Sequence, residues 1–287
     1  MRKLIDSPFD TALYLRLAIA FVLAWGLSGC AMTLVDWVTP NSGYSATTDI
    51  AYGELPRQQY DVYIPTEPLA NAPTLVFIYG GSWQEGDKDS YRFVAQAFAS
   101  AGYAVVIPDY RVYPAVKFPT FIEDCASAVA NYLDHNPDKE IVLVGHSAGA
   151  HIAAMLALNP EYLQAVSIDR NKISAWVGWS GPYDFLPITS PTLQTIFNGA
   201  DDIPETQPIH FANPKSPPAL LIHGEDDETV YPKNTRNLAA ALRQYHVPVE
   251  ELYYPDTGHI FTVGALISPF RSFAPTLEDT LTFLKKL

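Results

Sequence analysis

Short apolar segments alternate with helical patterns along most of this 287-residue chain. The expected strands are apolar on both faces, which is typical of a mostly parallel sheet with helices covering each side. The pattern therefore predicts an α/β fold. We expect strands at Thr74–Tyr79, Ala104–Pro108, Glu140–Val144, Ile173–Trp179, Ala219–His223 and Val249–Tyr254. We expect helices at Ser90–Ser100, about Phe118–Asp134, Lys233–Tyr245 and about Pro275–Leu287.

Two segments outside this alternation complete the predicted domain, residues 47–287. Thr47–Tyr52 and Gln59–Ile64 alternate in polarity well enough to be two antiparallel strands. Residues 182–213 carry five prolines and interrupt the alternation. Such a segment is typical of an irregular insertion, so we predict a cap or wall above the sheet.

The charge of the chain excludes one class of partner. Lys and Arg number 18 against 31 Asp and Glu, which gives a formal net charge of −13. Binding to nucleic-acid phosphates needs a basic face, so we predict no nucleic-acid partner. The seven histidines show no spacing typical of metal ligands beside a catalytic carboxylate. We therefore predict neither a metal nor another cofactor.

The N-terminus differs in kind from the rest. Arg2 and Lys3 precede the apolar run Leu17–Leu27, which has the length of a signal-peptide core and is short for a membrane span. The run ends in Leu-Ser-Gly before Cys30, which resembles a bacterial lipoprotein signal. The resemblance implies removal of residues 1–29, acylation of Cys30, a tether over residues 30–46, and anchoring in the cell envelope, on the outer membrane. The alternative is an uncleaved anchor or a buried apolar helix.

The segment Leu143–His151 (LVGHSAGAH) runs from a predicted strand directly into a predicted helix. In a parallel sheet, a residue on such a turn is exposed in the crevice at the strand ends. Ser147 occupies the turn, and Gly145 and Gly149 allow the strand and helix backbones to approach each other. Gly-x-Ser-x-Gly in this context predicts a nucleophile elbow.

A serine nucleophile needs a base, and the base needs a carboxylate to orient it. Asp227 follows the strand that ends at His223, and His259 follows the last predicted strand, so both can reach the crevice with Ser147. Asp226 is the alternative acid. Three other histidines are expected to pack or to form hydrogen bonds, the first of them pointing away from the nucleophile: His146, His151 and His223.

Acyl transfer places negative charge on the former carbonyl oxygen, which backbone N–H groups stabilise. One donor is expected at Ala148, directly after the nucleophile. The loop after the first long apolar strand contains two glycines, which let its backbone approach a substrate closely. We therefore predict the N–H groups of Gly81 and Ser82 as further donors.

Together these motifs resemble the α/β-hydrolase carboxylesterases, in the branch with acetyl-esterase, hormone-sensitive-lipase-like and kynurenine-formamidase enzymes. The resemblance extends from about residue 49 onward and includes the AYGELPRQQYDVYIP segment, the Gly-Gly-x-Trp loop, PDYRVYP and WSGPYDF. It implies an α/β-hydrolase fold and a serine esterase. The chain departs from the family at Tyr79, where a loop-bracing His is usual, and at Ser82, where a third Gly is usual. Asp109 and Arg111 are interpreted as a structural polar pair near the site.

The predicted function is hydrolysis of a small-molecule ester with a short-chain or aromatic acyl group. The insertion is short for a lipase lid, which disfavours long-chain substrates. The alternatives are an arylformamidase acting on an amide and a non-catalytic surface lipoprotein. The predicted acyl pocket consists of Trp83, Tyr183, Phe185, Ile260 and Phe261.

Overall fold

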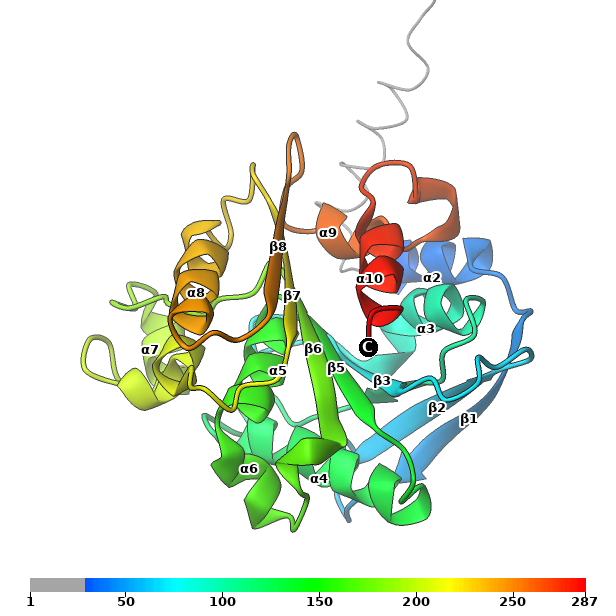
Figure 1. Cartoon of the computed structure of the whole chain (residues 1–287), viewed down its shortest axis with the longest axis horizontal. Helices are drawn as coiled ribbons and strands as arrows, with labels where there is room; N and C mark the ends of the chain where they lie inside the picture. Colours follow the sequence, from blue (N-terminus) through cyan, green and yellow to red (C-terminus); the bar gives the residue numbers. More distant parts are fainter. Residues whose placement is uncertain (1–28) are drawn as a thin grey trace, which may run out of the picture.

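The computed structural model describes residues 29–287. Its centre is an eight-stranded sheet in the order β1-β2-β4-β3-β5-β6-β7-β8 (Figure 1). Strand β2 pairs antiparallel with β1 and β4, and all the remaining pairs are parallel. This confirms the predicted mostly parallel sheet and its antiparallel N-terminal hairpin. The strands are β1 Tyr44–Ala51, β2 Gln59–Pro65, β3 Thr74–Ile78, β4 Val105–Pro108, β5 Ile141–His146, β6 Ile173–Trp179, β7 Ala219–Gly224 and β8 Val249–Tyr254.

Helices cover both faces of the sheet, which explains why the central strands are apolar throughout (Figure 1). Every residue of β3, β4, β5 and β7 is buried. One face carries α2, α3, α9 and α10, and the other carries α4, α5, α6 and α8. The helices are α2 Gly29–Val38, α3 Arg92–Ala99, α4 Thr120–His135, α5 Ala148–Leu158, α6 Pro160–Ala165, α7 Pro191–Phe197, α8 Lys233–Gln244, α9 Phe261–Gly264 and α10 Thr276–Leu284.

The insertion after β6 is more ordered than its prolines predict. It contains α7 and two 3₁₀ turns, Pro204–Thr206 and Pro208–Phe211. Helix α7 begins where Ser190 caps the N–H of Leu193, and Pro191 follows in the first helical position. A capping Ser followed by Pro is a common helix start, so the proline here marks a helix rather than breaking one.

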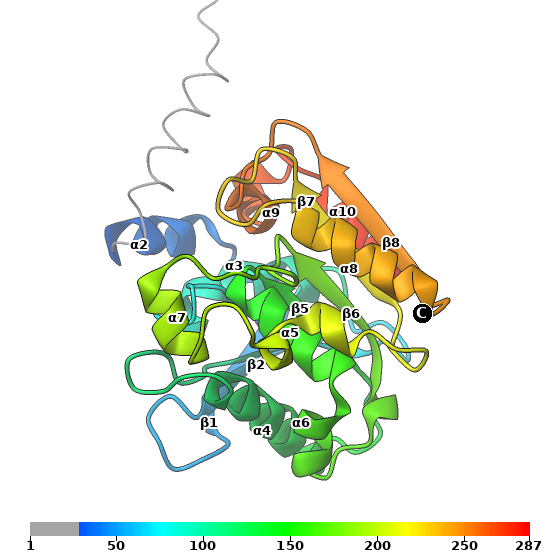
Figure 2. The ribbon, with the colours of Figure 1, turned by 90° about the vertical axis from the view of Figure 1, so that its left-hand side faces the viewer.

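The segment expected to be a tether is also structured. Residues 29–38 form α2, which lies beside α3 (Figures 1 and 2), and Val35 is buried. The guanidinium of Arg92 on α3 binds the carboxylate of Asp36 at 2.6 Å. The first part of the predicted tether is therefore held on the domain by the buried Val35 and by this ion pair.

The predicted signal peptide lies outside the described residues except for Gly29, so its cleavage and the acylation of Cys30 stay predictions. Between residues 29 and 287 no helix is long and apolar enough to cross a membrane.

Candidate active site

The elbow at Ser147 is built by close backbone packing. Ser147 joins β5 to α5 with φ 54° and ψ −124°, a strained conformation for a non-glycine residue. A Cβ on Gly149 would lie 2.0 Å from the carbonyl oxygen of Ile78, and one on Gly145 would lie 2.3 Å from that of Gly149. Only glycine fits at either position, which explains the Gly-x-Ser-x-Gly spacing.

Three predicted residues from distant parts of the chain meet at this turn. The hydroxyl of Ser147 lies 2.8 Å from Nε2 of His259, and Nδ1 of His259 lies 2.7 Å from Oδ2 of Asp227. Asp227 follows β7 and His259 follows β8, so neighbouring strand ends deliver both side chains to the same edge of the sheet. With the proton on Nδ1, Nε2 is free to accept the Ser147 proton.

Asp227, and not the neighbouring Asp226, holds the histidine. Asp226 is exposed, whereas Asp227 is buried and its Oδ1 accepts the backbone N–H groups of Thr229 and Val230 at 3.0 and 2.8 Å. Burial raises the pKa of Asp227, but hydrogen bonds from His223, His259 and the backbone outweigh it, so the pKa lies well below its usual range. The carboxylate therefore stays ionised and can stabilise an imidazolium on His259.

The other histidines near the elbow are buried supports. His146 packs its ring 4.9 Å from that of His259, and its Nε2 donates to the backbone carbonyl of His259 at 3.1 Å. Nε2 of His151 donates to the carbonyl of Thr206 at 2.8 Å. Burial lowers the pKa of His146 to about 3 and that of His151 to about 4, so both stay neutral at neutral pH. His146 thus contacts the catalytic candidate His259 directly, a contact that the sequence did not indicate.

The loop of residues 79–88, called the oxyanion loop here, lies directly against the elbow. A Cβ on Gly80 would lie 3.0 Å from Cβ of Ser147. Gly81 has φ +128°, and Ser82 and Trp83 also have positive φ values. The N–H groups of Gly81, Ser82 and Ala148 donate to no acceptor within residues 29–287. These are the three N–H groups that the sequence predicted as oxyanion donors, and that role stays a prediction.

The polar pair expected between Asp109 and Arg111 does not form. Arg111 instead binds Asp124 on α4 through two nitrogens, at 2.8 and 2.7 Å. Asp109 accepts the hydroxyl of Tyr79 at 2.7 Å and lies 3.8 Å from the guanidinium of Arg57. Residues two apart on an extended segment lie on the same face, which made a pair plausible. The two side chains nevertheless bind different partners from distant parts of the chain, and the local spacing does not reveal those partners.

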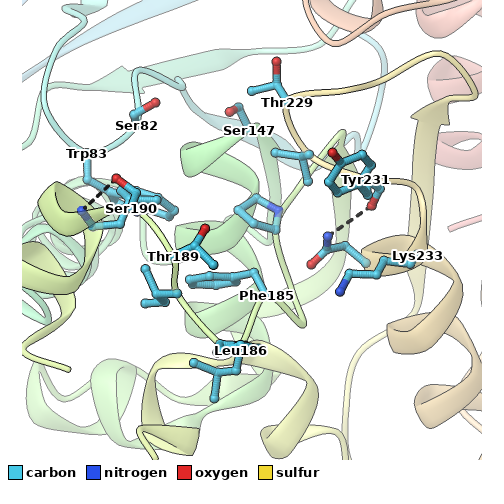
Figure 3. Close-up of a pocket in the computed structure, with 16 residues that line it drawn as sticks. Ser82, Trp83, Ser147, Phe185, Leu186, Thr189, Ser190, Thr229, Tyr231 and Lys233 are labelled. Carbon is cyan, nitrogen blue, oxygen red and sulfur yellow. Dashed lines mark hydrogen bonds between the residues drawn. The ribbon is translucent and has the colours of Figure 1, made fainter. Parts of the chain in front are cut away.

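A cavity of about 430 Å³ opens beside Ser147 (Figure 3). Ser82, Ser147 and Thr229 lie at one end in the view and Leu186 at the other, with Phe185 between them. The residues that line it are Ser82, Trp83, Ser147, Pro182, Phe185, Leu186, Pro187, Ile188, Thr189, Ser190, Leu193, Thr229, Val230, Tyr231, Lys233 and Asn234. The lining residues that come from the insertion all lie between residues 182 and 193.

Two of the five predicted pocket residues line this cavity, Trp83 and Phe185. The other three do not. Tyr183 is fully buried with its ring 5.9 Å from Trp176, so it belongs to the core. Phe261 packs against Phe273, and Ile260 is 38% exposed. They were predicted because they were expected near the crevice, but none of the three side chains lines the cavity.

Several lining residues could not be assigned from the sequence. Leu186, Ile188 and Leu193 come from the insertion, which offered a regional signal but no reason to choose individual positions. Tyr231 and Lys233 follow the Asp227 loop. No cluster of three or more His, Cys, Asp or Glu suited to a metal ion occurs in the described part of the chain.

Comparison with known proteins supports this reading of the fold. The chain is 29% identical over 251 residues to Esterase LipC of Mycobacterium tuberculosis, covering 77% of this chain and 61% of that protein. It is 26% identical over 238 residues to a probable isoprenylcysteine alpha-carbonyl methylesterase, ICMEL1, of Arabidopsis thaliana, covering 73% of this chain and 50% of that protein. The chain thus spans about half to three fifths of the length of these relatives.

Solved structures share the fold. Esterase B of Lactobacillus rhamnosis superposes with a TM-score of 0.74 at 20% identity, covering 96% of this chain and 95% of that one. The BD-FAE family matches residues 60–242. That span includes Ser147 and Asp227 and stops before His259, which lies in the loop between β8 and α9. With the parallel sheet, the elbow and the match over most of its length, the chain is a member of the BD-FAE family and has the α/β-hydrolase fold of the carboxylesterases.

Proposed function

We propose that the chain is a serine carboxylic ester hydrolase. The observation that carries the proposal is the continuous hydrogen-bonded series from Ser147 through His259 to Asp227, at 2.8 and 2.7 Å, beside unpaired backbone donors. The names of the relatives, an esterase and a probable methylesterase, support the same reaction class.

In the first half of the reaction, Oγ of Ser147 attacks the ester carbonyl carbon while Nε2 of His259 accepts the hydroxyl proton. Negative charge develops on the carbonyl oxygen, where the N–H groups of Gly81, Ser82 and Ala148 stabilise it. The tetrahedral intermediate collapses, the C–O bond to the alcohol breaks, and His259 returns the proton to the leaving oxygen. Asp227 stabilises the positive charge that His259 carries in between.

In the second half, a water molecule takes the place of the alcohol. His259 accepts a proton from the water, whose oxygen attacks the acyl carbon, and the same backbone donors stabilise the second oxyanion. The bond to Oγ then breaks, the acid leaves, and Ser147 regains its proton from His259.

The cavity beside Ser147 favours a short or aromatic acyl group. Its volume of about 430 Å³ is within the range of small-molecule sites. The indole of Trp83 and the ring of Phe185 lie 6.1 Å apart and nearly parallel, and both line the cavity. Flat apolar walls of this kind suit an aromatic ring or a few methylene groups.

An arylformamidase is the second candidate. Kynurenine formamidase of Salmo salar is 32% identical over 143 residues, covering 50% of this chain and 48% of that protein. The same nucleophile, base and oxyanion donors would act on a formamide, with His259 protonating an amine instead of an alcohol. A non-catalytic binding role is disfavoured because such scaffolds typically lose a triad member, and all three are present.

The test is hydrolysis of p-nitrophenyl esters from acetate to palmitate by residues 31–287, with Ser147→Ala as the control. We expect a rate that peaks at short chains and a loss of ~10⁴-fold or more in the variant. A peak at long chains would indicate a lipase. If no ester gives a rate that depends on Ser147, an N-aryl formamide is the next substrate to test, and failure there leaves the binding role.

The pH profile tests the base. A protonated imidazolium cannot accept the Ser147 proton, so kcat/KM should fall toward acid pH. A profile that stays flat down to pH 4 would contradict His259 as the base.

We also propose that Cys30 carries lipid and anchors the domain in the cell envelope, on the outer membrane. The support is the Leu-Ser-Gly-Cys sequence after an apolar run. Full-length protein expressed in a Gram-negative host with a clickable fatty acid should be labelled, and Cys30→Ala should not. Equal labelling of both would contradict the proposal.

A further inference from the structure

One side chain outside the family-matched region holds the oxyanion loop at two points. Arg57 lies in the connection between β1 and β2, before residue 60, where the BD-FAE match begins. Its Nη2 donates to the hydroxyl of Tyr79 at 2.8 Å and to the carbonyl oxygen of Gly86 at 2.6 Å. Its Nε donates to the carbonyl oxygen of Tyr110 at 2.7 Å, which ties the guanidinium to the segment that follows β4.

The hydroxyl of Tyr79 links Arg57 to a carboxylate, that of Asp109, by hydrogen bonds. It donates to Oδ1 of Asp109 at 2.7 Å while it accepts from Arg57. Burial, together with the nearby Tyr110 and Asp109, raises the pKa of Tyr79 well above its usual value, so the hydroxyl keeps its proton. Oδ1 of Asp109 also accepts the N–H of Lys88 at 2.8 Å. The first and last residues of the oxyanion loop are therefore bound to the same carboxylate oxygen.

The β1–β2 hairpin also binds the C-terminal end of the oxyanion loop, at Lys88. Lys88 is buried, and its ammonium lies 2.6 Å from the carboxylate of Asp49 in β1 and 2.9 Å from that of Asp61 in β2. The loop thus contacts the elbow at Gly80 and the β1–β2 hairpin through Arg57 and Lys88. Side chains of the hairpin therefore contact the loop near both of its ends.

We infer that Arg57 is a positioning residue for the reaction. Through its hydrogen bonds to the Tyr79 hydroxyl and the Gly86 carbonyl, it fixes the conformation of the oxyanion loop. The connection between β1 and β2 therefore contributes to the active site. The inference rests on the proposed esterase function. Backbone donors stabilise an oxyanion only when they are already in place, and a small displacement caused by a residue far from the chemistry lowers the rate strongly.

Arg57→Met tests this, with Arg111→Met as the matched control. The two guanidinium side chains are 34% and 28% exposed. That of Arg57 lies 3.8 Å from the carboxylate of Asp109, and that of Arg111 lies 2.7 Å from the carboxylate of Asp124 on α4. Within the part of the chain that the structure describes, Arg111 forms side-chain hydrogen bonds with Asp124 and with no residue of the oxyanion loop. Each substitution leaves a largely buried carboxylate, 14% exposed at Asp109 and 3% exposed at Asp124, without its cationic partner, so the melting temperature of both variants should fall. Only Arg57→Met should lower kcat, by ~10- to 100-fold, with KM within ~3-fold of wild type.

Tyr79→Phe removes a single hydroxyl and serves if Arg57→Met does not fold. We expect its kcat to fall by roughly 10-fold. If both side chains act through one loop, the double variant should lose less than the product of the two single losses. Hydrogen exchange is a measurement independent of turnover. The amides of residues 79–88 should exchange faster in Arg57→Met than in wild type, and their exchange rates in Arg111→Met should equal those of wild type.

The outcomes separate the inference from the function on which it rests. Equal kcat values in Arg57→Met and Arg111→Met, with an active wild type, would overturn the inference alone. A rise in KM with unchanged kcat would also overturn it, because displaced oxyanion donors act on the transition state. A wild type without any Ser147-dependent turnover would overturn the proposed function and the inference with it.

Discussion

The elbow and the oxyanion loop lie against each other, yet different forces hold them. Both contain non-glycine residues with positive φ, 54° at Ser147 and 51° and 59° at Ser82 and Trp83. The elbow is held by steric exclusion, because buried backbone surrounds Gly145 and Gly149. The loop is held by charged and hydroxyl side chains from distant segments. The closely packed elbow has no room for an added atom, so it is sensitive to larger side chains. The oxyanion loop depends on hydrogen bonds from a few long side chains, so its conformation is sensitive to the loss of one of them.

The largest effect on stability is expected at the elbow. In Gly149→Ala the new Cβ would lie 2.0 Å from the carbonyl oxygen of Ile78 and 2.4 Å from that of Tyr79. Backbone atoms in a buried sheet cannot give way easily, so we expect a loss of about 3 kcal/mol in the free energy of unfolding, measured in urea. The neighbouring Ala150→Gly should cost only about 1 kcal/mol. A loss below that of Ala150→Gly would show that the elbow is not tightly packed.

Acid pH should lower the free energy of unfolding through two buried histidines at the elbow, His146 and His151. The folded-state pKa values of His146 and His151, about 3 and about 4, lie below the ordinary value for histidine. The unfolded chain therefore binds more protons, and stability falls as the pH decreases from about 6.5 toward these values. Between pH 7 and 5 each residue should cost about 2 kcal/mol. The guanidinium of Arg57 stays protonated throughout this range.

His151→Gln checks this sign and size. An amide can still donate to the carbonyl of Thr206, but it does not titrate. The free energy of unfolding of the variant should fall about 2 kcal/mol less than that of wild type between pH 7 and 5. The exposed His210→Gln is the control. Identical slopes for wild type and His151→Gln would contradict the buried, neutral state of His151.

In the loop, activity should be more sensitive than stability. Gly86 has φ +100°, and a Cβ there would lie 2.8 Å from the carbonyl oxygen of Gly80 and 2.9 Å from the ring of Tyr79. Gly86→Ala should cost about 1–2 kcal/mol in unfolding free energy. Because the Gly86 carbonyl accepts from Arg57, kcat should also fall about 10-fold. A stability loss without any change in kcat would remove the distinction between the two regions.

The smallest effect is expected at a surface ion pair remote from both regions. Lys286 lies 2.8 Å from the carboxylate of Glu250, and the two side chains are 53% and 43% exposed. Solvent and salt screen such pairs, so Lys286→Ala should change the unfolding free energy by about 0.5 kcal/mol or less and leave kcat unchanged. A larger loss of unfolding free energy in Lys286→Ala, measured by thermal or urea denaturation, would show that even a remote surface substitution is destabilising. The losses in the other variants could then not be assigned to the elbow or to the loop.

Much of the fold was predictable because its signals are local. The apolar runs that end at Trp179 and Tyr254 match β6 and β8 to the residue, since flanking turn residues mark their ends. The errors occurred where tertiary contacts override composition. Residues 29–38 carry no strong helical signal of their own, but packing on α3 orders them as α2, and α7 begins at a proline that was interpreted as a mark of irregularity.

The candidate site divides in the same way. Ser147, Asp227 and His259 could be proposed from strand-end positions, because parallel strands deliver their C-terminal loops to one edge. The cavity could not, since whether Tyr183 faces the site or the core depends on the path of the insertion, and the structure buries it against Trp176. The predicted pairing of Arg111 with Asp109 was wrong for the same reason. Its actual partner, Asp124, lies on α4, and tertiary packing rather than sequence spacing places that helix beside Arg111.

The sequence by itself determined the eight strands along the chain, the elbow at Ser147 and the candidate positions of the acid and the base, because each depends on neighbours in the chain or on a rule of sheet topology. Only the tertiary structure decided how the oxyanion loop is held. Arg57 is 22 residues from Tyr79 and 53 from Tyr110, and no periodicity links them. Long polar side chains can reach many partners, and the packed sheet alone selects which of them meet.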